Sequence, residues 1–299
     1  MSSAAVLDRA RRTLEEAGLR GSFLVRDLDS GEEIGLEPDA AFPLASLVKV
    51  PLAIATLERV HRGELLASAA VHVEPGRITT PGPTGTSRFR HPASIAIDDL
   101  LYLSVSLSDN SAADALFTLT PRPAVLAELE RLGLRGLSVR HHLRDLAETP
   151  VESLGPGQAH LAHSLAIGAA TPGHGHALPH LDVSRANVGT ARAVTEVLQE
   201  LWRPRSVDVR TGERLRELLG ANVFRQRLAP DFHTDSSRWS SKTGTLLNLR
   251  HEAGVVEHAD GSTFAVTALT ESSVSAAAQP RAEAAMAHVA RTLRDHLRR

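Results

Sequence analysis

The sequence predicts an α+β fold in which an antiparallel sheet from both chain termini, flanked by helices, stands beside an all-helical lobe. Patterns typical of strands occur near both ends, whereas helical periodicity fills the middle. The strands follow one another as hairpins, which pair antiparallel. The simplest packing inserts the helices between the two halves of the sheet. We therefore expect a single domain, 1–299, with a sheet lobe at about 1–45 and 205–299 and a helical lobe at about 46–204.

The N-terminal residues predict a helix, a hairpin and a second helix. Residues 4–18 have apolar side chains at helical spacing and end at a glycine. The strand 21–28 (GSFLVRDL) is followed by the turn 29–31 (DSG) and a partner strand at 33–36. An apolar helix is then expected at 46–62.

The middle and the C-terminal end predict a helical segment followed by three strands. Residues 66–96 are rich in Pro, Gly and Thr and predict a long ordered loop. Residues 143–186 mix Gly, Pro and His with short apolar pieces and give no clear element. The remaining expected elements are helices at 98–106, 111–118, 122–132, 188–202, 211–219 and 280–297, and strands at 238–246, 250–257 and 263–270.

The composition excludes several classes of function. The formal net charge of −2 gives no positive electrostatic field that would attract nucleic acid. With one Tyr and two Trp, the chain also has few aromatic side chains on which bases could stack. The absence of cysteine excludes disulfides, thiol catalysis and Cys-based zinc sites. The N-terminal residues lack the apolar core of a signal peptide, and no apolar run could span a bilayer. We expect a cytoplasmic protein that contacts neither nucleic acid nor membrane.

The most informative feature is the placement of two lysines. Of 33 basic residues only Lys49 and Lys242 are lysines. Arginine stays protonated, whereas a buried lysine can lose its charge and act as a base. Lys49 ends the run 46–49 (SLVK), Lys242 begins the run 242–244 (KTG), and the run 108–110 (SDN) lies between them.

The first triplet has the spacing of a nucleophile and its base. Ser46 and Lys49 share one face if they lie on a helix. A serine at the start of that helix would be close to free N–H groups that stabilise an oxyanion. Desolvation would lower the pKa of Lys49, so that it could accept the Ser46 proton. Pro51 is an expected cost, because it removes an N–H that would bond the Leu47 carbonyl.

Each triplet alone also has a purely structural interpretation. The first could be a surface helix turn, and 108–110 could cap the helix that follows. The third, 242–244, could be a strand with a bulge glycine. In this order, however, S-x-x-K, S-D-N and K-T-G form the signature of penicillin-recognising serine enzymes.

The sequence resembles class A β-lactamases and the related penicillin-binding serine hydrolases over about residues 5–297. Residues 187–202 match the family helix that follows the Ω loop. The resemblance implies the β-lactamase/transpeptidase-like fold. It also implies a serine hydrolase that works through an acyl-enzyme, without a cofactor, on a small-molecule substrate such as a β-lactam or another acyl compound. It implies that Ser46 is the nucleophile, that Lys49 is its base or proton relay, and that Ser108 passes a proton to the leaving nitrogen.

The resemblance also implies residues that bind the substrate. Asn110 would hydrogen-bond an amide, while Lys242, Thr243 and Thr245 would hold a carboxylate. Gly244 would let the substrate backbone lie against the strand. The resemblance further assigns an assisting arginine, Arg250, and an oxyanion hole made of the N–H groups of Ser46 and Thr245.

A class A enzyme also needs an Ω-loop glutamate that activates water. Glu148 is the candidate, at about the family's distance from 108–110. The position of its usual Asn partner holds Glu152, and the usual arginine-aromatic pair is replaced by 146–147 (LA). A solvated loop carboxylate is therefore the alternative interpretation of Glu148.

The segment at about 155–185 is an insertion relative to the family. Its histidines have spacings that can bind zinc, but no cysteine accompanies them, so we predict no metal site. We interpret the insertion as a lid or wall beside the active site. The histidines concerned are His160, His163, His174, His176 and His180.

Three functions follow from these observations. The first is β-lactam hydrolysis through Ser46 and Glu148. The second is a cytoplasmic serine esterase, amidase or D-alanyl peptidase-like hydrolase of the same fold. The third is a non-catalytic penicillin-binding sensor. The rate at which an acyl group leaves Ser46 separates the three.

Overall fold

The structure, a computed structural model, describes residues 2–74, 84–145, 161–168, 175–274 and 278–298. Its main sheet has the strand order β2-β1-β9-β8-β7, and every neighbouring pair is antiparallel. This confirms the expected antiparallel sheet from both termini. The strands are β1 Leu19–Asp27, β2 Glu33–Leu36, β7 Ser237–Leu246, β8 Leu249–His258 and β9 Thr263–Ser272.

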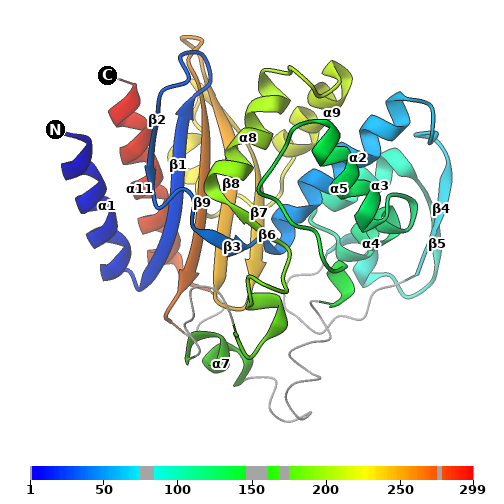
Figure 1. Ribbon diagram of the computed structural model, residues 1–299, viewed down its shortest axis with the longest axis horizontal. Coiled ribbons are helices and arrows are strands. Elements are labelled where there is room, and N and C mark those ends of the chain that lie inside the picture. Colours follow the sequence, from blue (N-terminus) through cyan, green and yellow to red (C-terminus); the bar gives the residue numbers. More distant parts are fainter. Residues whose placement is uncertain (1, 75–83, 146–160, 169–174, 275–277, 299) are drawn as a thin grey trace.

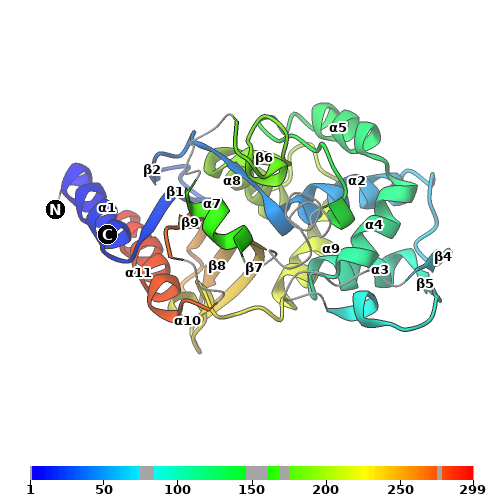
Figure 2. The ribbon, with the colours of Figure 1, turned by 90° about the horizontal axis from the view of Figure 1, so that it is seen from below.

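The two ends of the chain meet in the centre of this sheet. Strand β1 pairs with β9 from Leu19 opposite Ser272 to Asp27 opposite Phe264. The terminal helices α1 (Ser3–Glu16) and α11 (Pro280–Leu297) lie side by side on one face of the sheet (Figures 1 and 2). Apolar side chains of these helices and strands form one buried cluster, which accounts for the joining of both termini.

Helix α8 (Ala191–Trp202) covers the opposite face of the sheet (Figure 1). The Thr190 side chain caps it by accepting a hydrogen bond from the Ala193 N–H at 3.0 Å. The helical pattern predicts a start at Val188, but residues Val188–Thr190 form the short strand β6, paired with β3 (Ala41–Pro43). That pairing places the chain before Ser46 against the start of α8.

The helical lobe packs around α2 (Lys49–His61), which is buried on nearly all sides. The buried apolar side chains of the helical lobe form one cluster that continues onto the sheet, so the two lobes share a core. No helix in the described ranges is long and apolar enough to cross a membrane. The other larger helices are α3 Ile97–Val105, α4 Asn110–Leu119, α5 Arg122–Arg131 and α9 Val209–Gly220.

The expected loop at 66–96 contains regular structure. Strand β4 (Ala70–Val73) pairs with β5 (Ala93–Ala96), and the short 3-10 helix η2 (Gly85–Arg88) lies between them in the chain. Both strands are only four residues long, and their exposed positions give no sustained apolar alternation. The pattern was therefore too weak to be detected beside so many turn-forming residues. The remaining short elements are η1 Ala45–Val48, α7 Ala162–Gly168, η4 Pro179–Leu181 and α10 Ala229–Phe232.

Candidate active site

The turn that holds Ser46 is the 3-10 helix η1, which runs directly into α2. Ala45, just before Ser46, has a φ of +47°, a left-handed conformation that non-glycine residues seldom adopt. Strain of this kind persists only where the surroundings hold it, and it is concentrated at functional sites. Because α2 begins at Lys49, Pro51 lies in its first turn, where an N–H has no intrahelical acceptor. The expected cost of Pro51 is therefore small.

Lys49 contacts Ser46 of the first triplet and both Ser108 and Asn110 of the second. Its Nζ lies 3.2 Å from Ser46 Oγ, 2.6 Å from the Ser108 carbonyl and 2.7 Å from Asn110 Oδ1. The Ser108 Oγ is 3.2 Å away. The side chain is fully buried. Burial lowers the pKa of Lys49 to about 7, although the negative charges of Asp109 and Asp114 act against that shift.

A neutral amine can also make the closest hydrogen bonds of Lys49. A neutral amine has two N–H bonds and one lone pair, and the two closest partners are a carbonyl and an amide oxygen, which only accept. Those two oxygens, Ser108 O and Asn110 Oδ1, can occupy both N–H bonds. The lone pair then remains for the Ser46 hydroxyl.

The second triplet has both a structural and a chemical part. Asp109 caps α4 by accepting from the Ser111 N–H at 2.9 Å, as the purely structural interpretation required. It also accepts from the hydroxyls of Thr86 (2.6 Å) and Ser87 (2.9 Å) and so anchors η2. Ser108 has a φ of +58°. The rigid cap thus holds Ser108 in a strained conformation beside Lys49.

Lys242 completes a continuous hydrogen-bonded path. It donates to Ser108 Oγ at 2.9 Å and to the Thr243 carbonyl at 2.9 Å. Burial lowers its pKa well below the ordinary value, and the charges of Lys49 and Arg227 add to that shift. The path therefore runs from Ser46 through Lys49 and Ser108 to Lys242.

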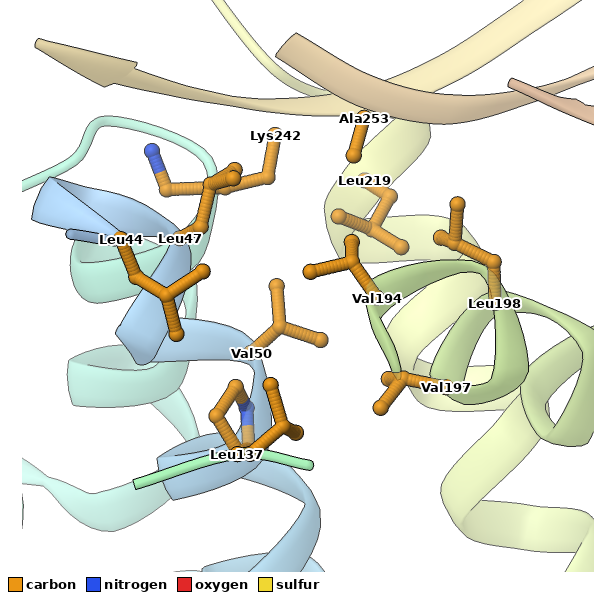
Figure 3. Close-up of a pocket in the computed structure, with 11 residues that line it drawn as sticks. Leu44, Leu47, Val50, Leu137, Val194, Val197, Leu198, Leu219, Lys242 and Ala253 are labelled. Atoms are coloured by element: carbon orange, nitrogen blue, oxygen red, sulfur yellow. The ribbon is translucent and has the colours of Figure 1, made fainter. Parts of the chain in front are cut away.

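An apolar cavity of about 20 Å³ lies behind these side chains. Figure 3 shows the Lys242 stem along one wall, with Leu47 and Val50 from the nucleophile side and Val194 from α8 pointing into the space. The apolar lining on this side contributes to the desolvation of the buried Lys242 side chain. The cavity is also lined by Leu44, Pro51, Leu137, Val197, Leu198, Leu219 and Ala253.

Gly244 is required by a close approach of two backbone segments. A Cβ at this position would lie 2.9 Å from the Leu44 carbonyl oxygen and 3.3 Å from Leu47. The glycine thus lets β7 lie against the nucleophile turn. Thr243 beside it is nearly buried, whereas Thr245 is exposed.

The arginine that contacts Thr245 is Arg227, which sequence analysis missed. Its guanidinium is 2 % exposed and donates to Thr245 Oγ1 at 2.6 Å and to the Gly244 carbonyl at 3.1 Å. Arg250 is buried and donates to the carbonyl of Leu249 at 2.8 Å and to that of Leu247. The substrate-assisting role of Arg250 stays a prediction. Arg227 lies between α9 and α10 in a segment without a recognisable motif, so only the fold could place it.

Glu148, Glu152, His160 and His174 lie outside the described residues, so the Ω-loop glutamate stays a prediction. In the described part of the insertion, the imidazole of His176 accepts from the Leu178 N–H at 2.9 Å. His180 packs edge-on against His141 with ring centroids 4.5 Å apart. No three His, Asp or Glu side chains among the described residues are arranged to hold a metal ion.

This fold and this serine–lysine site define a protein of the β-lactamase/transpeptidase class. The model of the "Beta-lactamase enzyme family" matches residues 6–297, and the chain belongs to that family. The β-lactamase regulatory protein BlaB of Streptomyces cacaoi is 58% identical over 100% of this chain and 99% of its own length.

Solved structures show the same fold. A β-lactamase from Chitinophaga pinensis superposes with a TM-score of 0.76 at 19% identity, over 98% of this chain and 99% of its own. A mutant of PBP-A, solved as an acyl-enzyme complex with penicillin G, has a TM-score of 0.76 at 15% identity. That comparison covers 99% of this chain and 97% of the PBP-A chain. The fold expected from the three triplets is thereby confirmed.

Proposed function

We propose that Ser46 is acylated by β-lactams and that the protein acts as their receptor in a regulatory role, releasing the acyl group slowly. The observation that supports acylation best is the position of Lys49. A fully buried amine whose pKa is lowered to about 7 lies 3.2 Å from Ser46 Oγ. An amine in that state can accept the serine proton near neutral pH.

The proposed acylation conserves every proton. Lys49 takes the proton of Ser46 as its Oγ attacks the lactam carbonyl, and the N–H groups of Ser46 and Thr245 stabilise the oxyanion. The Ser46 O–C bond forms and the lactam C–N bond breaks. Ser108, which lies 3.2 Å from Lys49 Nζ, gives its proton to the leaving nitrogen and recovers one from Lys49.

The proposed substrate site carries positive charge. Lys242, Thr243 and Thr245 would hold the substrate carboxylate, and Arg227 adds a second buried cation behind Thr245. An arriving carboxylate would favour the charged form of Lys242 and offset the cost of its burial. Asn110 Oδ1 is already bonded to Lys49, so its NH₂ group is the part that a substrate amide oxygen can use.

Two observations favour slow release over rapid hydrolysis. The relative from Streptomyces cacaoi, 58% identical, is named a regulatory protein. The segment around Glu148 also lacks the Asn partner and the arginine-aromatic pair of class A enzymes. Hydrolysis through Glu148, a β-lactamase activity, is the second candidate, supported by the complete set of three triplets. The cytoplasmic location stays a prediction.

The experiment is intact-protein mass spectrometry over time after mixing with benzylpenicillin and with a chromogenic cephalosporin, beside Ser46→Ala. A persistent adduct of one acyl group, absent in the variant, supports the receptor. A transient adduct with product formation supports a β-lactamase, and Glu148→Gln should then accumulate the adduct. Absence of any adduct rejects β-lactams, and esters and D-alanyl peptides become the acyl donors to assay.

A further inference from the structure

His251 is the third residue of β8, directly opposite Gly244 in the register with β7. Its side chain is completely buried, with the edge of Phe42 against it at a ring-centroid distance of 6.1 Å. Neither the sequence triplets nor the proposed mechanism uses this residue. Most buried polar groups in proteins are hydrogen-bonded, so the partners of a buried imidazole reveal what it holds.

The two partners of His251 fix its tautomer. The Thr270 N–H on β9 donates to Nδ1 at 3.0 Å, so Nδ1 has no proton. The Pro43 carbonyl, 2.8 Å from Nε2, can only accept, so Nε2 carries the proton. Burial lowers the pKa of His251 to about 3, which keeps the ring neutral. His251 therefore bridges β9 and the chain that leads into the nucleophile turn.

The Pro43 carbonyl precedes the strained part of that turn by two residues. Ala45 has the left-handed φ of +47°, and such a conformation relaxes unless neighbouring bonds prevent it. The Leu44 N–H is held from the other side by the Asn187 carbonyl at 2.7 Å. The His251 bond is thus a side-chain tether between the main sheet and this turn.

The backbone of His251 is tied to β7 as well. The Arg227 guanidinium donates to the His251 carbonyl at 2.7 Å and to the Gly244 carbonyl at 3.1 Å. Thr245 follows Gly244, and its N–H is one of the two proposed oxyanion donors. One residue therefore connects the strand of Thr245 with the turn of Ser46.

We propose that His251 is a positioning residue that sets the spacing between the N–H groups of Ser46 and Thr245 by holding the Pro43 carbonyl. The catalytic consequence rests on the proposed acylation of Ser46, whereas the tether itself does not. A displacement of about 1 Å at a reacting group can cost about 10²-fold in rate.

The paired variants His251→Asn and His251→Gln separate the two bonds. Asparagine places an oxygen near the position of Nδ1 and keeps the acceptor for Thr270, but it loses the donor to Pro43. Glutamine places an N–H near the position of Nε2 and keeps that donor. We expect His251→Asn to slow Ser46 acylation by benzylpenicillin about 10²-fold at saturation, with little change in the half-saturating concentration. His251→Gln should stay within about fivefold of the unaltered protein.

The control is His258→Gln, which removes a buried histidine at the other end of β8. His258 contacts Ser237 at 2.7 Å and Arg294 at 2.6 Å. Because these partners lie far along the strand from the nucleophile turn, acylation should be unchanged. Equal losses in His251→Asn and His251→Gln, or none in His251→Asn, would overturn the proposal.

Hydrogen–deuterium exchange of the segment 41–47 tests the tether without any substrate. We expect exchange there to rise about tenfold in His251→Asn and to stay unchanged in His251→Gln and His258→Gln. If the unaltered protein forms no adduct with benzylpenicillin, the proposed function fails while the exchange result still decides the role of His251. Unchanged exchange in His251→Asn refutes the tether.

Discussion

Lys49 and Lys242 meet in one site, and their burial explains why these two positions are not arginine. A lysine gives up its proton when desolvated, and it offers a compact amine that fits among short-range partners. Lys49 uses that property in the proposed mechanism as a neutral base. Lys242 touches the same Ser108 hydroxyl from the other side at 2.9 Å. Two amines this close and this deeply buried would repel each other if both were charged.

Replacing Lys49 by arginine should abolish acylation, because a guanidinium cannot become neutral at ordinary pH. We expect the acylation rate of Lys49→Arg to fall about 10³-fold or more, measured as adduct formation by intact mass. Lys242→Arg is the matched variant. It retains a cation for the substrate carboxylate, so a smaller loss is expected. Retained acylation in Lys49→Arg would show that Lys49 is not the base.

The pH dependence of acylation follows from the same residue. In the proposed mechanism the deprotonated form of Lys49 is the active one, and its pKa is lowered to about 7. The acylation rate at low substrate concentration should therefore rise tenfold per pH unit below about pH 7 and level off above it. Stopped-flow measurement with a chromogenic cephalosporin between pH 5.5 and 9 gives the profile. A rate independent of pH across this range would contradict a Lys49 base with a pKa of about 7.

At the scale of elements, the site depends on how closely β7 lies against the nucleophile turn. Gly244→Ala places a methyl group 2.9 Å from the Leu44 carbonyl oxygen, so one of the two segments must move. We expect acylation to fall about 10²-fold because the oxyanion donors separate. Gly168→Ala, where nothing lies within 4 Å, is the control. Unchanged acylation in Gly244→Ala would show that the close approach is dispensable.

Filling the cavity between α2, α8 and the sheet with a larger side chain is expected to stabilise the protein. Val194 points into this space of about 20 Å³, so Val194→Ile adds a methyl group to it (Figure 3). Filling the space should raise the free energy of unfolding by about 0.8 kcal/mol, measured by urea denaturation. Val209→Ile, at a residue 58 % exposed, should leave stability unchanged. A loss of stability in Val194→Ile would mean that the space cannot accept a methyl group without strain.

At the scale of the whole molecule, the buried histidines should make the fold sensitive to acid. Burial lowers the pKa of His251 to about 3 and those of His180 and His258 to about 4, from an ordinary 6.5. The unfolded chain then binds more protons than the folded one below pH 6.5. Stability from these groups is complete above pH 6.5 and decreases as the pH falls toward 4. The buried carboxyl Glu252, whose pKa is raised, acts in the opposite direction.

Urea denaturation at pH 7, 5.5 and 4.5 measures this effect. Each histidine that protonates only on unfolding contributes about 1.4 kcal/mol per pH unit. His258→Gln has no imidazole to protonate there, so its stability should fall less steeply with acid than that of the unaltered protein. The difference between the two slopes isolates the histidine from the carboxyl groups. Parallel slopes would contradict a neutral, buried His258.

Local sequence signals predicted the sheet and most helices because strand and helix periods are visible in runs of eight or more residues. The strand pairs β3–β6 and β4–β5 escaped detection because three or four residues give no measurable period. At the site, the triplets predicted Ser46, Lys49, Ser108, Asn110 and Lys242, which the structure brings together. Arg227 and His251 belong to no motif, and their contacts come from segments distant in the chain.

The sequence by itself determined the fold class, the family and the residues at the centre of the site. The spacing of chemically distinctive residues can be recognised along the chain without knowledge of the fold. Only the tertiary structure decided the burial, the charge state and the backbone geometry of those residues. The desolvation of Lys49 and Lys242 depends on the packing of both lobes around them. The strained φ of Ala45 and the tether from His251 to Pro43 depend on a register between strands. Burial and register arise from contacts between segments far apart in the chain, which no local pattern encodes.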